Sequence, residues 1–403
     1  MDIPKISLDD YLYDLPDERI AKHPLSERDA SKLLHYSKGQ ITHNTFSALP
    51  GLIPANATLF FNDTKVIPAR LFFSKDTGAK IEIFLLQPEK PSTVIAESML
   101  ASGSCAWSCM VGNFKKWKDD QILTRILTIG DQEIKLTAKI EDRKNTLIRF
   151  DWDNTSVKFV EIVEAAGTVP LPPYMNRQAT EEDKPRYQTV YSKNEGAVAA
   201  PTSGLHFTED VLEAIKDKGV ITDHLTLHVS AGTFRPIKEE NVLDHPMHSE
   251  QVIVSKQNVK NLANPDRRIF CVGTTSMRTI ESLYWYGVKL ISDPNAEFRI
   301  EKLYPYQFEK EDLPSRTESM TAVLDKMERD GVEKIHGSTE IFIFPGYSFP
   351  MIEGMVTNFH QPGSTLILLV AAFIGEDWRK IYKEAMDNGY RFLSYGDSSF
   401  LER

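Results

Sequence analysis

The clearest alternation of hydrophobic and polar residues runs from Val220 to Val229. Successive side chains of a strand point to opposite faces, so this segment predicts a strand with one apolar and one polar face. The polar face carries His224, Thr226 and His228. We therefore expect the apolar face to join a core and the polar face to contribute to a site.

This strand lies within a longer stretch, residues 196–250, that is rich in histidine, glycine and hydroxyl side chains. A helix is predicted before the strand, because Thr208 is a good N-cap and two acidic residues follow it. Gly219 is expected to end that helix. Elements this short do not need so many polar residues for stability, which indicates a functional role for the stretch.

Hydrophobic runs elsewhere divide the chain into two kinds of sequence. From residue 70 to 152, short strand-like runs are separated by Gly, Pro and Asn, as is typical of a small barrel or sandwich. These runs are KIEIFLL, TVIAESML, QILTRILTI, QEIKLTAKI and NTLIRFDW. Beyond them, helical and strand-like segments alternate as in α/β proteins. We predict a main α/β domain, residues 1–68 and 153–403, with an inserted small β-barrel domain, residues 69–152.

Several predicted strands of the α/β part end in polar turns. Thr58–Phe61 predicts a buried strand that ends in Asn, Asp and Thr. In IFCVGTTSMRTIES, a strand ends at Gly273 and a helix begins with two threonines whose amides and hydroxyls would face an anion. Within that helix, Arg278 and Glu281 lie one turn apart, and the simplest interpretation is an ion pair between them.

Two further junctions follow the same pattern. IFIFPGYSF predicts a buried strand that meets Pro345 and Gly346, and TNFHQPGSTLILL predicts a polar turn before a buried helix. Each junction alone is best explained as a turn. Together, four such junctions predict a crevice built from loops at the ends of strands.

Composition is that of a globular protein, with 41% hydrophobic and 26% charged residues. The formal charge of −10 argues against a protein coated in nucleic acid, although a local basic patch can act within an acidic total. Three cysteines cannot form a disulfide framework, and the first residues lack the apolar core of a signal peptide. The longest apolar run is about half of the ~20 residues that a membrane span needs. We expect a cytoplasmic monomer with no membrane segment.

Standard cofactor and metal signatures are missing. No two glycines are separated by a single residue, so the G-x-G nucleotide fingerprint is absent, and there is no Walker A loop. Cys105 and Cys109 have the first spacing of an iron–sulfur triad, but Gly112 occupies the third position. The histidines form no H-E-x-x-H arrangement. We expect chemistry without a metal or prosthetic group.

Long motifs across nearly the full length resemble one family. They are FNDTKVIPARL, GTVPLPPYMNR, RYQTVYS, GAVAAPTSGLHFT, LHVSAGTFRPI, HPMHSE, VGTTSMRTIES, TEIFIFPGYSF, TNFHQPGSTLILLVAAF and YRFLSYGD. The chain resembles the S-adenosylmethionine:tRNA ribosyltransferase-isomerases of queuosine biosynthesis. The resemblance implies an α/β domain with an inserted β-barrel. It also implies transfer and isomerisation of the ribosyl part of S-adenosylmethionine, a co-substrate, onto 7-aminomethyl-7-deazaguanine at the wobble position of a tRNA. Epoxyqueuosine-tRNA, adenine and methionine would be the products.

This reaction indicates which residues to consider. A sulfonium makes the adjacent C5′ proton acidic, so a placed base can start the rearrangement. The candidates for proton transfer are His206 and Glu250, followed by His228 and His360. A structural histidine bonded to a carbonyl is the competing interpretation for each of them. Arg235 or Arg278 could bind the methionine carboxylate. Further candidates for substrate binding are Asp63, Arg70, Thr202, Ser203, Thr274, Thr275 and Asn358.

Other functions stay open on sequence grounds. A divergent paralogue could modify RNA with S-adenosylmethionine in another way, and an ordinary methyltransferase would release S-adenosylhomocysteine. A tRNA-binding protein without catalysis would need only a basic surface, for which Lys115, Lys116 and Lys118 are candidates. A short run of charges is more often a solvated loop. The polar crevice favours an enzyme.

Overall fold

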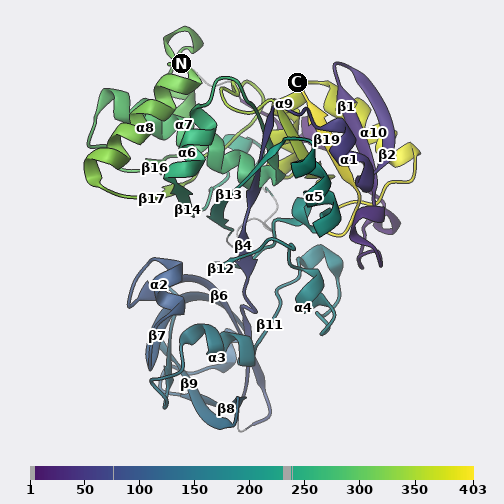
Figure 1. Ribbon diagram of the computed structural model, residues 1–403. Helices are drawn as coiled ribbons and strands as arrows, with labels where there is room; N and C mark the ends of the chain where they lie inside the picture. Colours follow the sequence, from purple (N-terminus) through teal and green to yellow (C-terminus); the bar gives the residue numbers. More distant parts are fainter. Residues whose placement is uncertain (1–4, 76, 230–236, 238) are drawn as a thin grey trace.

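The computed structural model describes residues 5–75, 77–229, 237 and 239–403. It is a mixed α/β structure with a ten-stranded sheet above and a curled seven-stranded sheet below (Figure 1). A two-stranded ribbon of β4 (Thr64–Val66) and β12 (Asn194–Ala197) lies between them. The predicted α/β architecture is therefore confirmed for the larger part of the chain.

Four parallel strands form the middle of the large sheet. They lie in the order β13 (Ile221–His228), β3 (Ala57–Asn62), β15 (Arg268–Val272) and β18 (Gly354–Asn358). Because these strands are parallel, their carboxyl ends all lie at the same end of the sheet. The chain passes from β3 to β13 on one side and then to β15 on the other, and ligands of α/β proteins bind where the strand order reverses in this way. The outer strands are β14 (Glu250–Ser255), β17 (Lys334–Thr339) and β16 (Arg299–Ile300) on the β13 side, and β19 (Ser398–Glu402), β1 (Lys32–Ser37) and β2 (Gln40–Thr45) on the β18 side.

Both faces of β3, β15 and β18 are buried, as is the carboxyl half of β13. All six residues of β3 are buried, which confirms the predicted strand over Thr58–Phe61. In β15, Ile269 and Cys271 join the larger core, whereas Phe270 and Val272 join a smaller core on the opposite face. Because successive side chains point to opposite faces, this one strand contributes residues to both cores.

Helices cover the two faces. The larger core includes residues of α6 (Lys256–Ala263), α7 (Gly273–Ser292), α8 (Arg316–Asp330), α9 (Thr365–Ile374) and α10 (Asp377–Asp387). The smaller core includes residues of α1 (Leu49–Leu52) and α5 (Glu209–Asp217). Helix α5 begins as predicted, because the Thr208 side chain accepts a hydrogen bond from the Val211 amide. Gly219 follows its end with a positive φ of 87°.

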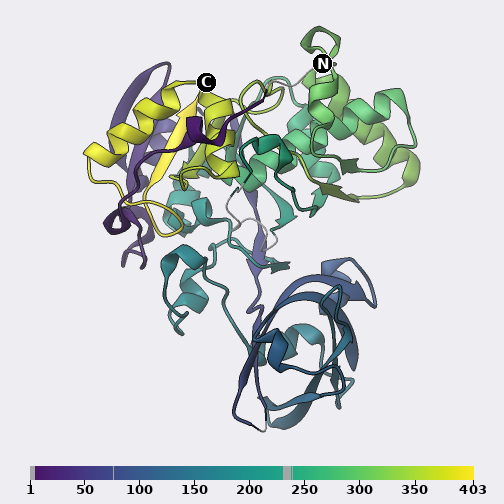
Figure 2. The ribbon, with the colours of Figure 1, turned by 180° about the vertical axis from the view of Figure 1, so that it is seen from behind.

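The seven-stranded sheet is antiparallel and strongly curled, as two opposite views show (Figures 1 and 2). Its hydrogen-bonded order leaves β11 and β8 at the two edges, and Arg125 of β8 donates to the Phe72 carbonyl of β5. Helix α3 (Phe159–Ala166) packs into the core of this sheet. The strands are β5 (Arg70–Ser74), β6 (Lys80–Lys90), β7 (Ser104–Gly112), β8 (Leu123–Ile129), β9 (Gln132–Asp142), β10 (Leu147–Trp152) and β11 (Gly167–Thr168).

Two sequence predictions of strands are wrong. The segment TVIAESML contains a short helix, α2 (Ile95–Met99), whose first and last residues point into the core of the curled sheet. Residues 341–344 are buried but form no strand. Within the described ranges, no helix combines the length and apolarity that a membrane crossing requires.

Candidate functional site

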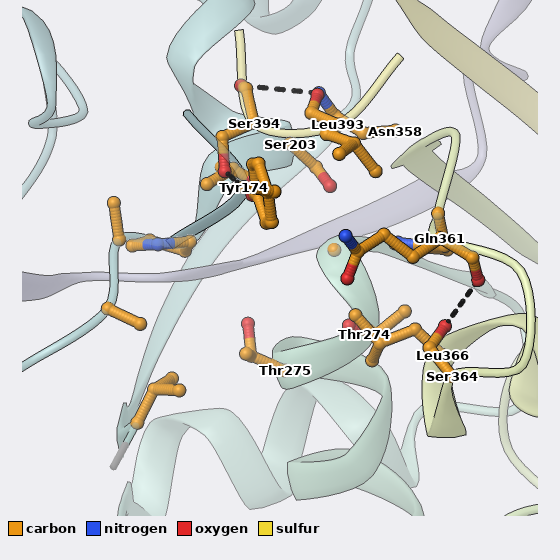
Figure 3. Close-up of a pocket in the computed structure, with 17 residues that line it drawn as sticks. Tyr174, Ser203, Thr274, Thr275, Asn358, Gln361, Ser364, Leu366, Leu393 and Ser394 are labelled. Carbon is orange, nitrogen blue, oxygen red and sulfur yellow. Dashed lines mark hydrogen bonds between the residues drawn. The ribbon is translucent and has the colours of Figure 1, made fainter. Parts of the chain in front are cut away.

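A pocket lies at the carboxyl edge of the central parallel strands (Figure 3). It is bordered by the residues that follow β13, β15 and β18 and by a loop that precedes β19. The space measures about 750 Å³, including the part open to solvent. Six predicted site residues border it: Thr202, Ser203, Thr274, Thr275, Asn358 and His360.

The floor of the pocket is the junction between β15 and α7. Gly273 takes a φ of +83°, which favours glycine and lets the chain turn from strand to helix without strain. Thr274 and Thr275 follow at the first turn of a 20-residue helix, where free amides and the helix dipole favour negative charge. The Thr275 hydroxyl is buried and has no hydrogen-bond partner among the described residues. In Figure 3 it points into the open space.

Asn358 forms the opposite wall at the end of β18. Its side-chain Nδ2 donates to the Leu393 carbonyl at 2.9 Å and lies 3.4 Å from Nε2 of His206. Its side chain is 2% exposed, yet Oδ1 has no partner in the described part of the chain. A buried amide oxygen without a donor carries the full free-energy penalty of desolvation. A hydrogen bond from a ligand to this atom would therefore be favourable.

His360 also borders the pocket, two residues beyond Asn358. Its Nε2 lies 3.0 Å from the Thr357 hydroxyl, and its amide donates to the Tyr382 hydroxyl at 3.0 Å. Burial lowers its pKa from 6.5 to about 3. The imidazole is therefore neutral near pH 7, and burial disfavours its protonated form.

His206 lies in the wall behind Asn358 and does not line this pocket. It ends a short 3₁₀ segment, Thr202–His206, whose first two residues do face the pocket. Its Nδ1 lies 2.9 Å from the Ser31 hydroxyl. Burial lowers its pKa from 6.5 to about 4, partly offset by the negative charge of Asp397.

His228 and Asp63 belong to a polar network at the ends of β13 and β3. His228 Nδ1 lies 3.1 Å from the Thr64 hydroxyl, and Asp63 accepts hydrogen bonds from Thr226 at 2.7 Å and Asn194 at 3.0 Å. Burial lowers the pKa of His228 to about 4, against the opposing charge of Asp63. Neither residue is among those bordering the pocket, although Val229 after His228 is.

Glu250 forms a buried ion pair with Arg278. The expected pair between Arg278 and Glu281 is therefore wrong, because Arg278 turns toward β14 instead. Glu281 is fully buried and accepts a hydrogen bond from the Tyr347 hydroxyl at 2.9 Å. Burial raises the pKa of Glu281 to about 8. Neither Glu250 nor Arg278 borders the pocket.

The two remaining predicted residues lie elsewhere. Arg70 is on β5 of the curled sheet, where its Nε is 3.5 Å from Glu82 and its guanidinium lies over the Phe84 ring. Arg235 falls outside the described residues. The structure thus brings six of the thirteen predicted residues to one pocket.

Sequence reasoning missed several polar residues of the pocket. They are Tyr174, Gln361, Ser364 and Ser394. Tyr174 bonds Ser394 through their hydroxyls at 2.5 Å, which joins two segments 220 residues apart. All four occur in the motifs GTVPLPPYMNR, TNFHQPGSTLILLVAAF and YRFLSYGD, so the motifs themselves held the signal.

No group of three or more potential metal ligands occurs among the described residues. All three cysteines are free and buried, and burial raises the pKa of each thiol well above its usual value. A buried thiol with a raised pKa is a poor ligand and a poor nucleophile.

Two comparisons with known proteins concern the family of the chain. The chain is similar to the crystal structure of an S-adenosylmethionine tRNA ribosyltransferase from Thermotoga maritima, with 26% sequence identity and a TM-score of 0.45. That match covers 97% of this chain and 99% of the other. A family model described as queuosine biosynthesis protein matches residues 8–401. Because this match spans nearly the whole chain, the protein belongs to the queuosine biosynthesis protein family.

Proposed function

We propose that this protein transfers and isomerises the ribosyl moiety of S-adenosylmethionine onto 7-aminomethyl-7-deazaguanine at the wobble position of a tRNA. Epoxyqueuosine-tRNA forms, and adenine and methionine leave. Membership of the queuosine biosynthesis family supports this proposal. The observation that carries it is the polar pocket at the edge of the sheet, with two buried oxygen atoms that lack partners in the described chain.

The pocket offers groups suited to each part of S-adenosylmethionine. The amides and hydroxyls of Thr274 and Thr275 favour the methionine carboxylate, because they lie at the positive end of α7. Thr202, Ser203 and Asn358 offer donors and acceptors for ribose or adenine edges. Arg278, Asp63 and Arg70 are proposed as more distant contributors to substrate binding. Arg235, outside the described residues, is proposed as a ligand of the methionine carboxylate.

We place proton transfer first at His360, because it is the one predicted base that borders the pocket. Its imidazole is neutral near pH 7, as a base must be, and the burial that keeps it neutral also disfavours the protonated form that the transfer of the C5′ proton creates. His206 acts through Asn358 as a positioning residue. Glu250 and His228 are alternative proton carriers on adjacent strands.

The tRNA and the architecture belong to the same proposal. We propose that residues 1–68 and 153–403 form the catalytic α/β domain and residues 69–152 an inserted β-barrel domain that helps to hold tRNA. The enzyme acts in the cytoplasm, as a monomer, with S-adenosylmethionine as co-substrate and no metal. None of the chemistry above requires a metal ion, since the sulfonium itself acidifies the proton that moves.

One incubation tests this function. The protein is mixed with S-adenosylmethionine and tRNA that carries 7-aminomethyl-7-deazaguanine, and the wobble nucleoside is examined by mass spectrometry. Free adenine and methionine are expected in equal amounts, with and without a strong chelator. Release of S-adenosylhomocysteine would instead indicate a methyltransferase. Absence of any turnover of S-adenosylmethionine would favour a tRNA-binding protein without catalysis.

The proton-transfer role is tested by His360→Ala. We expect kcat to fall at least ~100-fold while tRNA still binds, because general acid–base groups contribute factors of that size. Near-normal kcat would remove His360 from the mechanism and return attention to Glu250 and His228.

A further inference from the structure

A second pocket lies beside the first and is rich in arginine. Arg28, Arg186 and Arg391 border it, together with His206, Ser394 and several other residues of the amino-terminal loop and the segment before β19. Ser394 borders both pockets. The two pockets are therefore neighbours that share a wall.

The 3₁₀ segment Thr202–His206 forms much of this wall. Thr202 and Ser203 face the first pocket, whereas Leu205 and His206 face the second. Gly204 lies between them, and a Cβ there would come within 1.9 Å of the Tyr191 hydroxyl. The segment is thus held tightly against the core, and a ligand on one side lies close to a ligand on the other.

Two of the arginines bond backbone carbonyls rather than carboxylates. Arg28 donates to the carbonyls of Leu205 and Pro185, both at 3.0 Å. Arg186 donates to the carbonyls of Ser26 at 2.9 Å and Leu25 at 2.6 Å. Neither arginine takes part in any ion pair found between described residues. Each has used two of the five N–H donors of a guanidinium.

A second observation concerns Arg186 alone. Its Nε is buried and has no hydrogen-bond partner among the described residues. A buried N–H of a charged group without an acceptor is costly, so an acceptor from outside the chain would satisfy it. Carbonyl bonds hold the guanidinium in place beforehand, which lowers the entropy lost on binding.

Two acids near this pocket, Asp397 and Asp183, already bind other side chains. Asp397 accepts hydrogen bonds from Arg391, at 2.8 Å from its amide and 3.2 Å from its guanidinium. Asp183, which the Tyr395 hydroxyl contacts at 3.0 Å, is bonded to both terminal nitrogens of Arg177 at 2.7 Å. Glu27 borders the pocket but is exposed. Burial, and then the neighbouring charge of Arg186, lower the pKa of Arg28.

We propose that this second pocket binds a backbone phosphate of the tRNA next to the wobble nucleotide that reacts with S-adenosylmethionine in the first pocket, with Arg28 and Arg186 as its ligands. This inference rests on the proposed function, because it takes tRNA as the nucleic acid. Arginine matches phosphate well, since its planar fork donates two parallel hydrogen bonds. The arrangement also explains how a chain of net charge −10 can hold an anionic substrate close to its chemistry.

The methionine carboxylate of S-adenosylmethionine is another anion that two arginines could bind. A phosphate is favoured because the wall of His206 and Ser394 separates the arginines from the first pocket. That first pocket already offers the amino end of α7 to a carboxylate. The two sources differ in a measurable way, because only a phosphate contact releases counterions from RNA.

The protein-side test is the double variant Arg28→Gln/Arg186→Gln, with tRNA binding titrated at several salt concentrations. We expect affinity to fall at least ~10-fold and the slope of log K against log salt to become shallower by roughly one, as for the loss of one phosphate contact. Affinity for S-adenosylmethionine should stay within about two-fold of the wild type. Arg316→Gln is the matched control, since Arg316 also bonds two carbonyls and lies on α8.

An RNA-side test avoids any loss of folding. Anticodon stem-loops are made with a neutral methylphosphonate at each phosphate flanking the wobble nucleotide. One substitution should weaken binding to the wild-type protein and have little effect on the double variant. Arg186→Lys should keep most of the salt slope, because it keeps the charge, but lose affinity with the fork.

Three results would overturn the inference. An unchanged salt slope in the double variant would show that the two arginines only hold the loop in place through their bonds to backbone carbonyls. Weaker binding of S-adenosylmethionine with unchanged tRNA affinity would assign the pocket to the carboxylate. Equal effects of every methylphosphonate on wild type and double variant would place the phosphate elsewhere. If tRNA binds with the expected slopes but no epoxyqueuosine forms, the proposed function fails and the phosphate pocket stands.

Discussion

Arg278 of α7 and Glu250 of β14 form an ion pair in the interior of the protein, with 11% and 3% of their side chains exposed. Nε and Nη2 of Arg278 are buried and have no other partner among the described residues. Such a pair contributes little net stability when intact, but removing one partner leaves a buried charge without compensation. The ion pair therefore links the amino-terminal part of α7, next to the pocket floor, to the first residue of β14.

Glu250→Gln should lower the free energy of unfolding by about 3 kcal/mol, because Arg278 would keep its charge in a desolvated place. The double variant Glu250→Gln/Arg278→Met should be closer to the wild type than the single variant. Urea unfolding measures both. The control is Asp387→Asn, which removes an exposed partner of Lys383 and should cost less than about 1 kcal/mol. Additive losses in the double variant would contradict the coupling.

The same variant separates a structural role of Glu250 from proton transfer. Its kcat should be measured at a temperature where the variant is fully folded. A loss of at least ~100-fold would support proton transfer by Glu250. A kcat close to that of the wild type would confine Glu250 to holding Arg278.

The stability of the protein should fall on acidification because of buried histidines. Burial lowers the pKa of His206 from 6.5 to about 4, so between these values the unfolded chain binds more protons than the folded one. Stability is fully present above about pH 6.5 and is lost progressively as the pH falls to about 4. At about 1.4 kcal/mol per pKa unit, the loss from one such residue is about 3 kcal/mol.

Unfolding free energies measured between these pH values check this expectation. His206→Gln should reduce the slope of the unfolding free energy against pH by the contribution of one proton. The contributions of His228 and His360 should remain. His23→Gln, which changes an exposed histidine, should leave the slope as it is. An identical slope in the His206 and His23 variants would show that His206 takes up its proton in the folded state as well.

The elements that the sequence predicted correctly follow from local rules. The buried run of β3, the alternation of β13 and the Thr208 cap each depend on residues within a few positions. The junction at Gly273 was also predictable, because glycine before two threonines marks a strand-to-helix turn. Of these features, the junction at Gly273 supplies the floor of the pocket.

The errors come from contacts between distant segments. Ile95 and Met99 lie one helical turn apart and are buried together, which overrides the strand propensity of TVIAESML. The Phe342 amide bonds the Lys302 carbonyl instead of a strand partner. Arg278 selects Glu250, 28 residues away, over Glu281.

The site was predictable in outline and not in detail. Polar turns after parallel strands indicated a crevice, and six of the chosen residues do meet there. Which histidine faces the ligand could not be read from the chain, because His206, His228 and His360 all follow similar polar junctions. Their burial and hydrogen bonds depend on partners such as Ser31, Thr64 and Thr357.

Asn358→Ala should weaken binding of S-adenosylmethionine about 10-fold or more, because a buried acceptor that awaits a ligand would be lost. The matched control is Asn258→Ala. Asn258 is equally buried at 2% exposure, but its amide bonds Asp223 and the His224 carbonyl away from the pocket. Calorimetry should show weaker binding only for the first variant. Equal affinities in the two variants would exclude Asn358 as a contact.

A lysine cluster on the curled sheet is the last candidate for tRNA binding. Lys115, Lys116 and Lys118 are exposed at the turn after β7, and Lys75 donates to the Lys116 carbonyl. Asp119 pairs with Arg143 near this turn, so part of the local charge is already balanced. The cluster therefore fits a few phosphate contacts rather than a broad basic surface.

Replacing the three lysines by Ala should weaken tRNA binding and make the salt slope shallower by roughly two, with S-adenosylmethionine binding unchanged, because the first pocket lies on the other sheet. The control replaces Lys260, Lys310 and Lys334, which are exposed near α6 and α8. An unchanged slope in the first triple variant would make the cluster a solvated turn. The slope of the wild type, expected to correspond to roughly three to five counterions, would then have to come from the α/β part of the chain. Arg28 and Arg186 lie in short helical segments, Arg28–Ala30 and Asp183–Arg186, outside the curled sheet that carries the lysines. The losses of affinity in a combined variant should therefore add, and a clear departure from additivity would mean that the two surfaces do not bind the same tRNA independently.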